Sequence, residues 1–129
     1  MKPVKQLALS LKETKVRKVL LEEITESEAE PFLLNFSHLL LKDGPGFFLQ
    51  FECAVTHQAG VKLSVKFIAE FVTDKQVTAE FCETDFAKIN APAIAYPFLR
   101  AYIANFFISS GYDALMLPTI NFQAMARNS

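Results

Sequence analysis

Residues 47–71, FFLQFECAVTHQAGVKLSVKFIAEF, decide the fold of this chain. Apolar residues occupy alternate positions over residues 47–55 and again over residues 61–71, with polar residues such as Glu52 and Lys66 between them. This period of two, in stretches rich in Val and Phe, is typical of half-buried strands. Between the two strands, residues 57–60, HQAG, form a connection short enough to force an antiparallel hairpin. The sequence therefore predicts two paired strands here.

Two further strands are predicted upstream of this hairpin. One covers about residues 32–41 and ends at the turn-forming residues 42–46, KDGPG. Its apolar face carries Phe32, Leu34, Phe36, His38 and Leu40. Residues 7–23 are less regular, because their alternation breaks phase after Leu11. A helix fits the later part of this segment, but a long strand with a bulge agrees better with the β-rich surroundings.

A long helix is predicted downstream, over residues 93–108. Residues 76–82 fit an extended piece and residues 83–88 a short helix. Asn90 is a candidate cap, and Pro92 suits a first turn. Gly111 is a natural helix end. Pro97 lies inside the run, so we expect it to kink the helix or delay its regular part.

This helix is apolar nearly all round, apart from Arg100 and Asn105. A surface helix needs one apolar stripe, whereas this one has at least two. A single sheet can cover only one of them, so the other must meet a second subunit or a ligand. The candidate subunit contacts are Tyr102, Ile103, Phe106 and Phe107. The sequence therefore predicts an α+β domain over residues 1–129, in which a four-stranded antiparallel sheet carries one long C-terminal helix, and it predicts oligomerisation.

Composition excludes several classes of protein. The formal net charge of -1 gives no basic patch for nucleic acid. No stretch of about 18 apolar residues occurs, so we expect no membrane insertion. Two cysteines make no disulfide framework, and the N-terminal residues do not read as a signal peptide, so a cytoplasmic location is expected. The 13 phenylalanines exceed the ordinary needs of one small core and indicate an apolar binding face or a subunit interface.

Catalytic equipment is scarce in this sequence. Neither His38 nor His57 belongs to a metal-ligand spacing, and both are expected to serve as packed structural residues. Cys53 alternates with core residues, and Cys82 has no nearby cation to activate it. There is also no phosphate-binding glycine loop or nucleophile elbow. We therefore expect a non-enzymatic protein without cofactor or metal.

Two motifs in the last forty residues carry a family resemblance. Residues 90–100, NAPAIAYPFLR, contain a proline, a few apolar residues and then an aromatic-Pro-aromatic step followed by Arg100. Residues 117–122, LPTINF, form a Pro-x-Ile-Asn-Phe loop, and Gly111 lies where the helix should end. In type, order and spacing these motifs resemble the long helix and following loop of the SecB-type export chaperones.

The resemblance implies both an assembly and a task. SecB-type subunits pair through sheet edges and helices, commonly as a dimer of dimers, and hold unfolded polypeptides in apolar grooves without ATP. Carried over by position, the client-binding candidates are Phe71, Tyr96, Phe98, Leu115, Leu117 and Phe122. The family's acidic surface for the translocase motor is missing here, since the corresponding strand face reads Lys62, Ser64 and Lys66, with only Glu70 acidic.

Three interpretations stay open at this point. The first is a polypeptide-holding chaperone, for export or for a toxin–antitoxin system. The second is an oligomeric adaptor whose groove is filled by its own side chains. The third is a small-ligand binder or enzyme that uses the cleft between sheet and helix.

Overall fold

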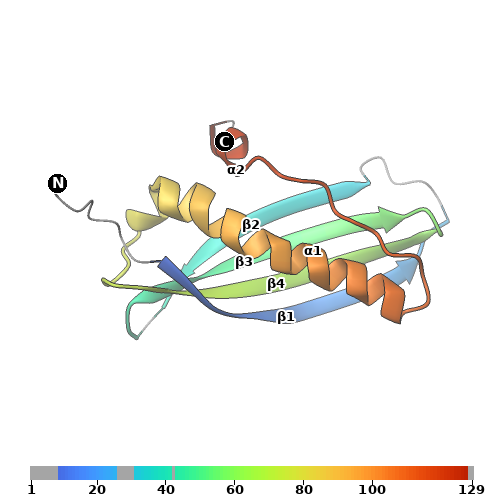
Figure 1. Cartoon of the computed structure of the whole chain (residues 1–129), viewed down its shortest axis with the longest axis horizontal. Helices are drawn as coiled ribbons and strands as arrows, with labels where there is room; N and C mark the ends of the chain where they lie inside the picture. The colour runs from blue at the N-terminus through green and yellow to red at the C-terminus, as the bar shows by residue number, and fades with distance from the viewer. Residues whose placement is uncertain (1–8, 26–30, 42, 128–129) are drawn as a thin grey trace, which may run out of the picture.

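The computed structural model describes residues 9–25, 31–41 and 43–127 and confirms the predicted α+β architecture. One antiparallel sheet has the order β1-β4-β3-β2, and a long helix lies across one of its faces (Figure 1). The strands are β1 (Leu9–Glu23), β2 (Phe32–Leu40), β3 (Gly46–His57) and β4 (Val61–Thr73). They are followed by η1 (Phe81–Glu83), η2 (Phe86–Asn90), α1 (Ala91–Ser109) and α2 (Phe122–Arg127). Leu7 and Lys42, expected in a strand and a turn, lie outside the described residues.

The predicted hairpin forms the two central strands of the sheet. Phe51 pairs with Phe67 and Val55 with Leu63, so the apolar residues of both strands share one face. At the other end of β3, Gly46 lies so close to β4 that a Cβ here would collide with the carbonyl oxygen of Phe71. Only glycine therefore allows the chain to enter β3 at this point.

β1 is a strand with two irregularities, as the interpretation of a bulged strand predicted, and it is not a helix. Its register against β4 shifts between Leu11 and Glu13 and again between Val16 and Lys18. Each extra residue restores the apolar side chains to the helix-covered face after the alternation has slipped. These bulges explain why the sequence pattern breaks phase.

The start of the helix corrects two expectations. Asn90 has helical angles (φ -70°, ψ -46°) and no side-chain cap, because η2 leads directly into α1. In η2, a π turn, the amide of Ala91 donates to the carbonyl of Phe86, five residues back. This wider turn precedes Pro92, whose ring would crowd an ordinary turn. The possible extended piece over residues 76–82 does not form a strand, whereas the short helix expected near residues 83–88 corresponds to the helical turns η1 and η2.

α1 continues through Pro97 without a break and ends where predicted. Pro97 and Ala93 are both exposed, so water can reach the Ala93 carbonyl that proline leaves without a donor. At the other end, Gly111 has φ 94°, and the amide of Tyr112 donates to the carbonyl of Phe107 at 2.9 Å. This is the glycine-terminated end that a helix adopts when its last residue turns left-handed.

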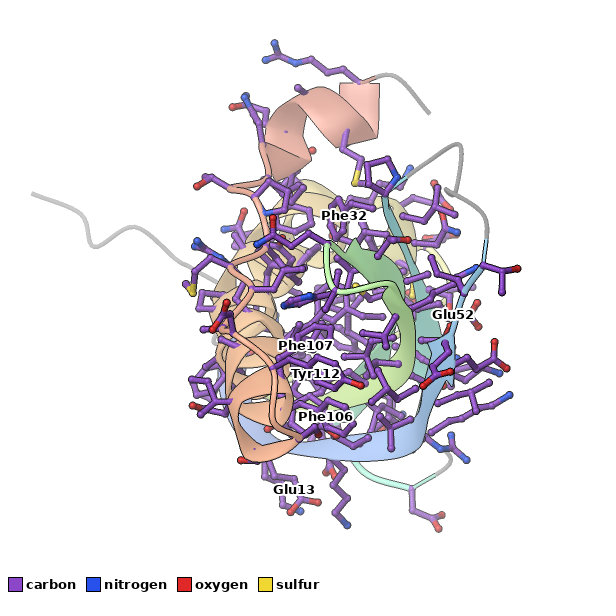
Figure 2. The ribbon with its side chains drawn as sticks, turned by 90° about the vertical axis from the view of Figure 1, so that its right-hand side faces the viewer. Glu13, Phe32, Glu52, Phe106, Phe107 and Tyr112 are labelled. Atoms are coloured by element: carbon purple, nitrogen blue, oxygen red, sulfur yellow. The ribbon has the colours of Figure 1, made fainter. Side chains whose placement is uncertain are left out.

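The core lies between α1 and the sheet. Leu99, Ile103 and Phe107 of α1 are fully buried there, against residues such as Phe51 and Leu63 of the central strands. Figure 2 shows Phe107 between α1 and the sheet, while Glu52 points away from the helix on the opposite face. The sheet therefore has one face covered by α1 and one open face.

Candidate functional site

An aromatic cluster lies beneath the N-terminal half of α1, on the β2 side of the sheet. The ring of Phe122 in α2 lies 5.5 Å from Tyr96 and 5.9 Å from Phe36, measured between centroids. Phe51 of β3 completes the cluster, 6.2 Å from both Tyr96 and Phe36. Several of these contacts are edge-on, a geometry that aromatic rings favour. The cluster thus joins the sheet, α1 and α2.

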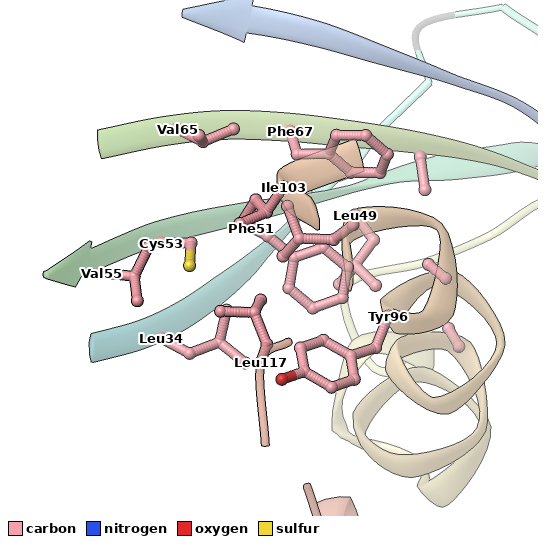
Figure 3. Close-up of a cluster of buried hydrophobic side chains, with 14 of the residues drawn as sticks. Leu34, Leu49, Phe51, Cys53, Val55, Val65, Phe67, Tyr96, Ile103 and Leu117 are labelled. Atoms are coloured by element: carbon pink, nitrogen blue, oxygen red, sulfur yellow. The ribbon is translucent and has the colours of Figure 1, made fainter. Parts of the chain in front are cut away.

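The segment between the two helices, residues 112–121, is called the strap here. It has no regular secondary structure and runs back past the β2 side of the sheet towards α2 (Figure 1). Leu117 anchors it with a side chain that is 1% exposed. Figure 3 shows this side chain between Leu34 and Phe51 of the sheet and Tyr96 of α1.

Side-chain donors fasten the strap by its carbonyl groups. The hydroxyl of Tyr96 donates to Pro118 at 2.6 Å, and Arg100 Nε donates to Leu117 at 3.1 Å. At the far end, His57 Nδ1 accepts from the amide of Ala59, so Nε2 carries the proton and donates to the Asp113 carbonyl at 2.9 Å. Burial raises the pKa of Tyr96 to about 12, so its hydroxyl keeps the proton that it donates.

A hollow of about 400 Å³ opens beside this cluster, between β2, the η1–η2 segment and α2. Its apolar lining comes from Leu34, Phe36 and Met125, and its polar lining includes His38 and Lys88. β2 lies at the edge of the sheet, and among the described residues no other strand pairs with its outer side. The hollow therefore combines apolar side chains with a strand edge that can accept another strand.

The polar groups at this hollow are arranged as structural contacts. His38 Nε2 donates to the Ala87 carbonyl at 2.6 Å, and burial lowers the pKa of this histidine. Lys88 pairs with Glu83 at 2.8 Å and thereby lowers the pKa of that carboxyl group. Burial and the nearby Glu83 raise the pKa of Cys82, which keeps it a thiol. These contacts tie His38, Lys88 and Glu83 to their neighbours and leave Cys82 a protonated thiol.

Among the described residues, no group of three or more His, Cys, Asp or Glu side chains could hold a metal ion. No described helix is both long enough and apolar enough to cross a bilayer.

The six client-binding candidates occupy different environments. Tyr96, Leu117 and Phe122 come together at the aromatic cluster and are buried. Leu115 in the strap is partly buried. Phe71 is fully buried and stacks on Phe47 at 5.2 Å, so it offers no surface in the protomer. Phe98, 51% exposed, lies on the outer side of α1.

Three residues that line the hollow were missed by the sequence analysis, namely Leu34, Phe36 and Met125. The alternation in β2 places Leu34 and Phe36 on the helix-covered face, and this signal was present in the sequence. That β2 is an edge strand follows only from the sheet order.

The expected subunit contacts need a correction for Ile103 and Phe107. Both are fully buried in the protomer's own core, because their side of α1 faces the sheet. Tyr102 and Phe106 are partly buried at the margin of this core. The ring centroids of Tyr102 and Phe67 lie 6.1 Å apart. The outer stripe of α1 consists of Ile94, Phe98, Ala101, Asn105 and Ile108. This outer stripe is the second apolar side of the helix that the sequence predicted.

Comparison with known proteins places the chain in a family. Residues 48–129, well over half of the chain, match the family described as Preprotein translocase subunit SecB. No curated protein matches the sequence.

Two solved structures share the fold. A SecB-like chaperone from Mycobacterium tuberculosis, in complex with a ChAD peptide from the HigA1 antitoxin, is 16% identical, has a TM-score of 0.62 and overlaps over 87% of each chain. A Streptococcus agalactiae protein of unknown function is 8% identical and has a TM-score of 0.69, with 89% of this chain and 100% of that one covered. The family match supports a chaperone role and agrees with the motifs at residues 90–100 and 117–122. This chain is a divergent member of the SecB family.

Proposed function

We propose that this protein is an ATP-independent, non-enzymatic chaperone that holds non-native polypeptides in the hollow between β2 and α2. The observation that carries the proposal is the apolar lining of the hollow, beside an edge strand with no partner on its outer side. An extended client segment would pair with the backbone of β2 and place alternate side chains against Leu34, Phe36 and Met125.

The aromatic cluster and the strap form the wall of this proposed groove. Tyr96, Leu117 and Phe122 keep the wall in place, and Leu115 supplies a partly buried side chain on the strap. Support for a peptide-sized occupant comes from the Mycobacterium tuberculosis relative, whose structure contains an antitoxin peptide. Holding by this route stabilises the unfolded client through mass action and needs no nucleotide.

We further propose a homo-oligomer, a dimer or a dimer of dimers, with a cytoplasmic location. The outer stripe of α1 is largely apolar and exposed, and β1 is the second edge strand of the sheet. Covering Phe98 and Ile108, which are 51% and 56% exposed, would remove apolar surface from water. Tyr102 and Phe106 at the margin of the stripe would join that contact.

Besides secretory precursors, antitoxins are a second candidate class of client. The relative bound to an antitoxin peptide favours service to a toxin–antitoxin system. An antitoxin-derived peptide and a secretory precursor, presented unfolded in parallel binding assays, would separate the two sources.

The test of holding is suppression of aggregation. The full chain, at a near-stoichiometric ratio and without nucleotide, should slow the light scattering of a reduced, unfolded client. A well-folded sample that neither slows aggregation nor binds an unfolded chain contradicts the proposal. An oligomer that binds no hydrophobic dye would indicate the adaptor interpretation, and a small molecule retained in native mass spectrometry would indicate a ligand binder.

A further inference from the structure

The open face of the sheet is largely polar but carries two apolar regions, one of which, with Leu20, Leu33 and Ala54, lies towards the β3–β4 connection. Most side chains on this face are polar, for example Gln50 and Glu52 on β3 and Ser64 and Lys66 on β4. At the end near the β2–β3 connection, however, Ile68 and Phe48 belong to this face. A hollow of about 490 Å³ lies over them, on the opposite side of the sheet from α1 and the proposed client groove. It is called the open-face hollow here.

The lining of the open-face hollow is nearly all carbon. It is made by Leu39, Leu40, Leu41, Phe48 and Ile68. Ile68 is only 9% exposed and forms the base, whereas Leu39 and Leu40 are 44% and 42% exposed and form the rim. A volume of this size is in the range of sites that take a ligand or a bulky side chain.

Two cations, Lys15 and Arg17 of β1, complete the rim. Arg17 is the extra residue of the second bulge, between Val16, opposite Phe67, and Lys18, opposite Lys66. The bulge explains the position of Arg17, because an extra residue re-aims its side chain relative to the strict alternation of a strand.

The charge of Arg17 is left without a carboxylate among the described residues. Glu13 lies 3.4 Å from Lys15, and Glu70 lies 3.3 Å from Lys12, so both nearby carboxylates already have an amine partner. No ion pair joins Arg17 to a carboxylate within residues 9–25, 31–41 and 43–127. The open-face hollow therefore presents an apolar base beside a guanidinium group that can take a carboxylate in two parallel hydrogen bonds.

These features select one kind of occupant. A second copy, docked symmetrically through this hollow, would set Arg17 and Lys15 against the same cations of its partner. Nucleic acid requires a larger basic surface than two cations around a carbon-lined base. From the apolar base and the guanidinium group we infer that the open-face hollow docks an acidic segment of a partner protein. A bulky apolar side chain of the segment enters the hollow, and a neighbouring carboxylate pairs with Arg17.

The probe is a blocked peptide with the core Glu-Leu-Phe-Glu, compared with its Lys-Leu-Phe-Lys counterpart, both carrying the same uncharged fluorophore. Fluorescence anisotropy with the full chain should show the acidic peptide binding about tenfold more tightly at low salt, with the preference reduced by added salt. Arg17→Glu should remove or reverse the preference. Arg127→Glu, the same charge change on exposed α2, is the matched control and should keep it.

A second variant tests the apolar half of the site. Leu39→Ser changes an exposed rim residue, so it should leave the fold intact and weaken binding of the acidic peptide by a few-fold. The inference is overturned if Arg17→Glu and Arg127→Glu change peptide binding equally, since the effect would then be one of net charge. It is also overturned if Arg17→Glu alters the sedimentation mass while peptide binding stays unchanged, which would assign the face to a second copy.

Discussion

The hydroxyl of Tyr96 donates a 2.6 Å hydrogen bond to the backbone carbonyl of Pro118, twenty-two residues later. This contact joins the two sequence motifs that identify the family, because Tyr96 belongs to the aromatic-Pro-aromatic step and Pro118 to the loop after the helix. The aromatic motif thus fixes the backbone of the second motif, and it does so through a donor that phenylalanine lacks.

Tyr96→Phe should therefore destabilise the protein while the ring packing is kept. We expect the free energy of unfolding to fall by about 1 kcal/mol, which is the usual net contribution of one hydrogen bond together with the cost of leaving a carbonyl group unsatisfied. Chemical denaturation measures this loss, and hydrogen exchange should show faster opening of the strap. Tyr102→Phe is the matched control, since no hydrogen bond of its hydroxyl is seen among the described residues. Equal losses in both variants would contradict the role given to the Tyr96 hydroxyl.

The free energy of unfolding should also fall at alkaline pH, because the Tyr96 hydroxyl must keep its proton to donate this hydrogen bond. Burial is the largest cause that raises the pKa of Tyr96 to about 12, above its value of about 10 in an unfolded chain. The folded state then holds the proton more tightly, so this stabilisation is complete below pH 10 and is lost as the pH rises to 12. In denaturation at stepped pH, the wild type should lose more stability over this interval than Tyr96→Phe. Parallel curves would argue against the shift.

Met125→Asp tests the proposed client groove. Met125 lines the hollow beside β2, and a carboxylate there would have to be desolvated against an apolar client segment. We expect about tenfold weaker binding of an unfolded client and a matching loss of aggregation suppression. Met116→Asp is the control, because Met116 is 64% exposed on the strap and does not line that hollow. If the two variants behave alike, the client lies elsewhere.

Phe98→Asp tests the outer stripe of α1 as the surface between copies. The change puts a charge in the middle of an apolar contact, so the oligomer should dissociate, with its mass by light scattering falling to that of a smaller species. Ala93→Asp adds the same charge at an exposed position of the first turn, outside the outer stripe, and should keep the wild-type mass. A monomeric wild type would refute the proposed assembly.

The two cysteines should react at very different rates. Cys53 is buried, and burial raises its thiol pKa to about 12, so it should react with a disulfide reagent only after unfolding. Cys82 is partly exposed and should react slowly in the native protein. Glu83→Gln removes a charge that raises the pKa of Cys82 and should speed its reaction by about threefold. Cys82→Ser should abolish the native reaction, and a persistent fast thiol would contradict this assignment.

The strands were predictable because their alternation is a local property. Residues 47–71 carry it over two stretches, and the register Phe51–Phe67 confirms the pairing. Gly111 was predictable for a similar reason, since a left-handed residue after an apolar helix needs glycine. Asn90 was not, because the choice between a cap and a continuous π turn depends on how η2 packs against η1, α2 and His38 of β2. The extent of the single domain over residues 1–129 stays a prediction.

The candidate site was only partly predictable. The family resemblance assigned Tyr96, Leu117 and Phe122 to one candidate binding site. The structure places these three residues in one buried cluster. It could not tell which side of α1 faces the sheet, because a helix that is apolar all round has no clear inner stripe. Ile103 and Phe107 were therefore assigned to the outside, which Phe98 and Ile108 occupy. Phe36 entered the site only through the sheet order.

The attachment of the strap also determines how the protein answers a pulling force. Tension on α2, such as a refolding client would exert, reaches the ring contacts of Phe122 first, then the hydrogen bonds of Pro118 and Leu117, and the Asp113 contact at the tip of the β3–β4 hairpin last. Bonds loaded one after another rupture by peeling, at lower force than bonds loaded together. The strap should consequently yield in steps, before the paired strands that hold its anchors separate.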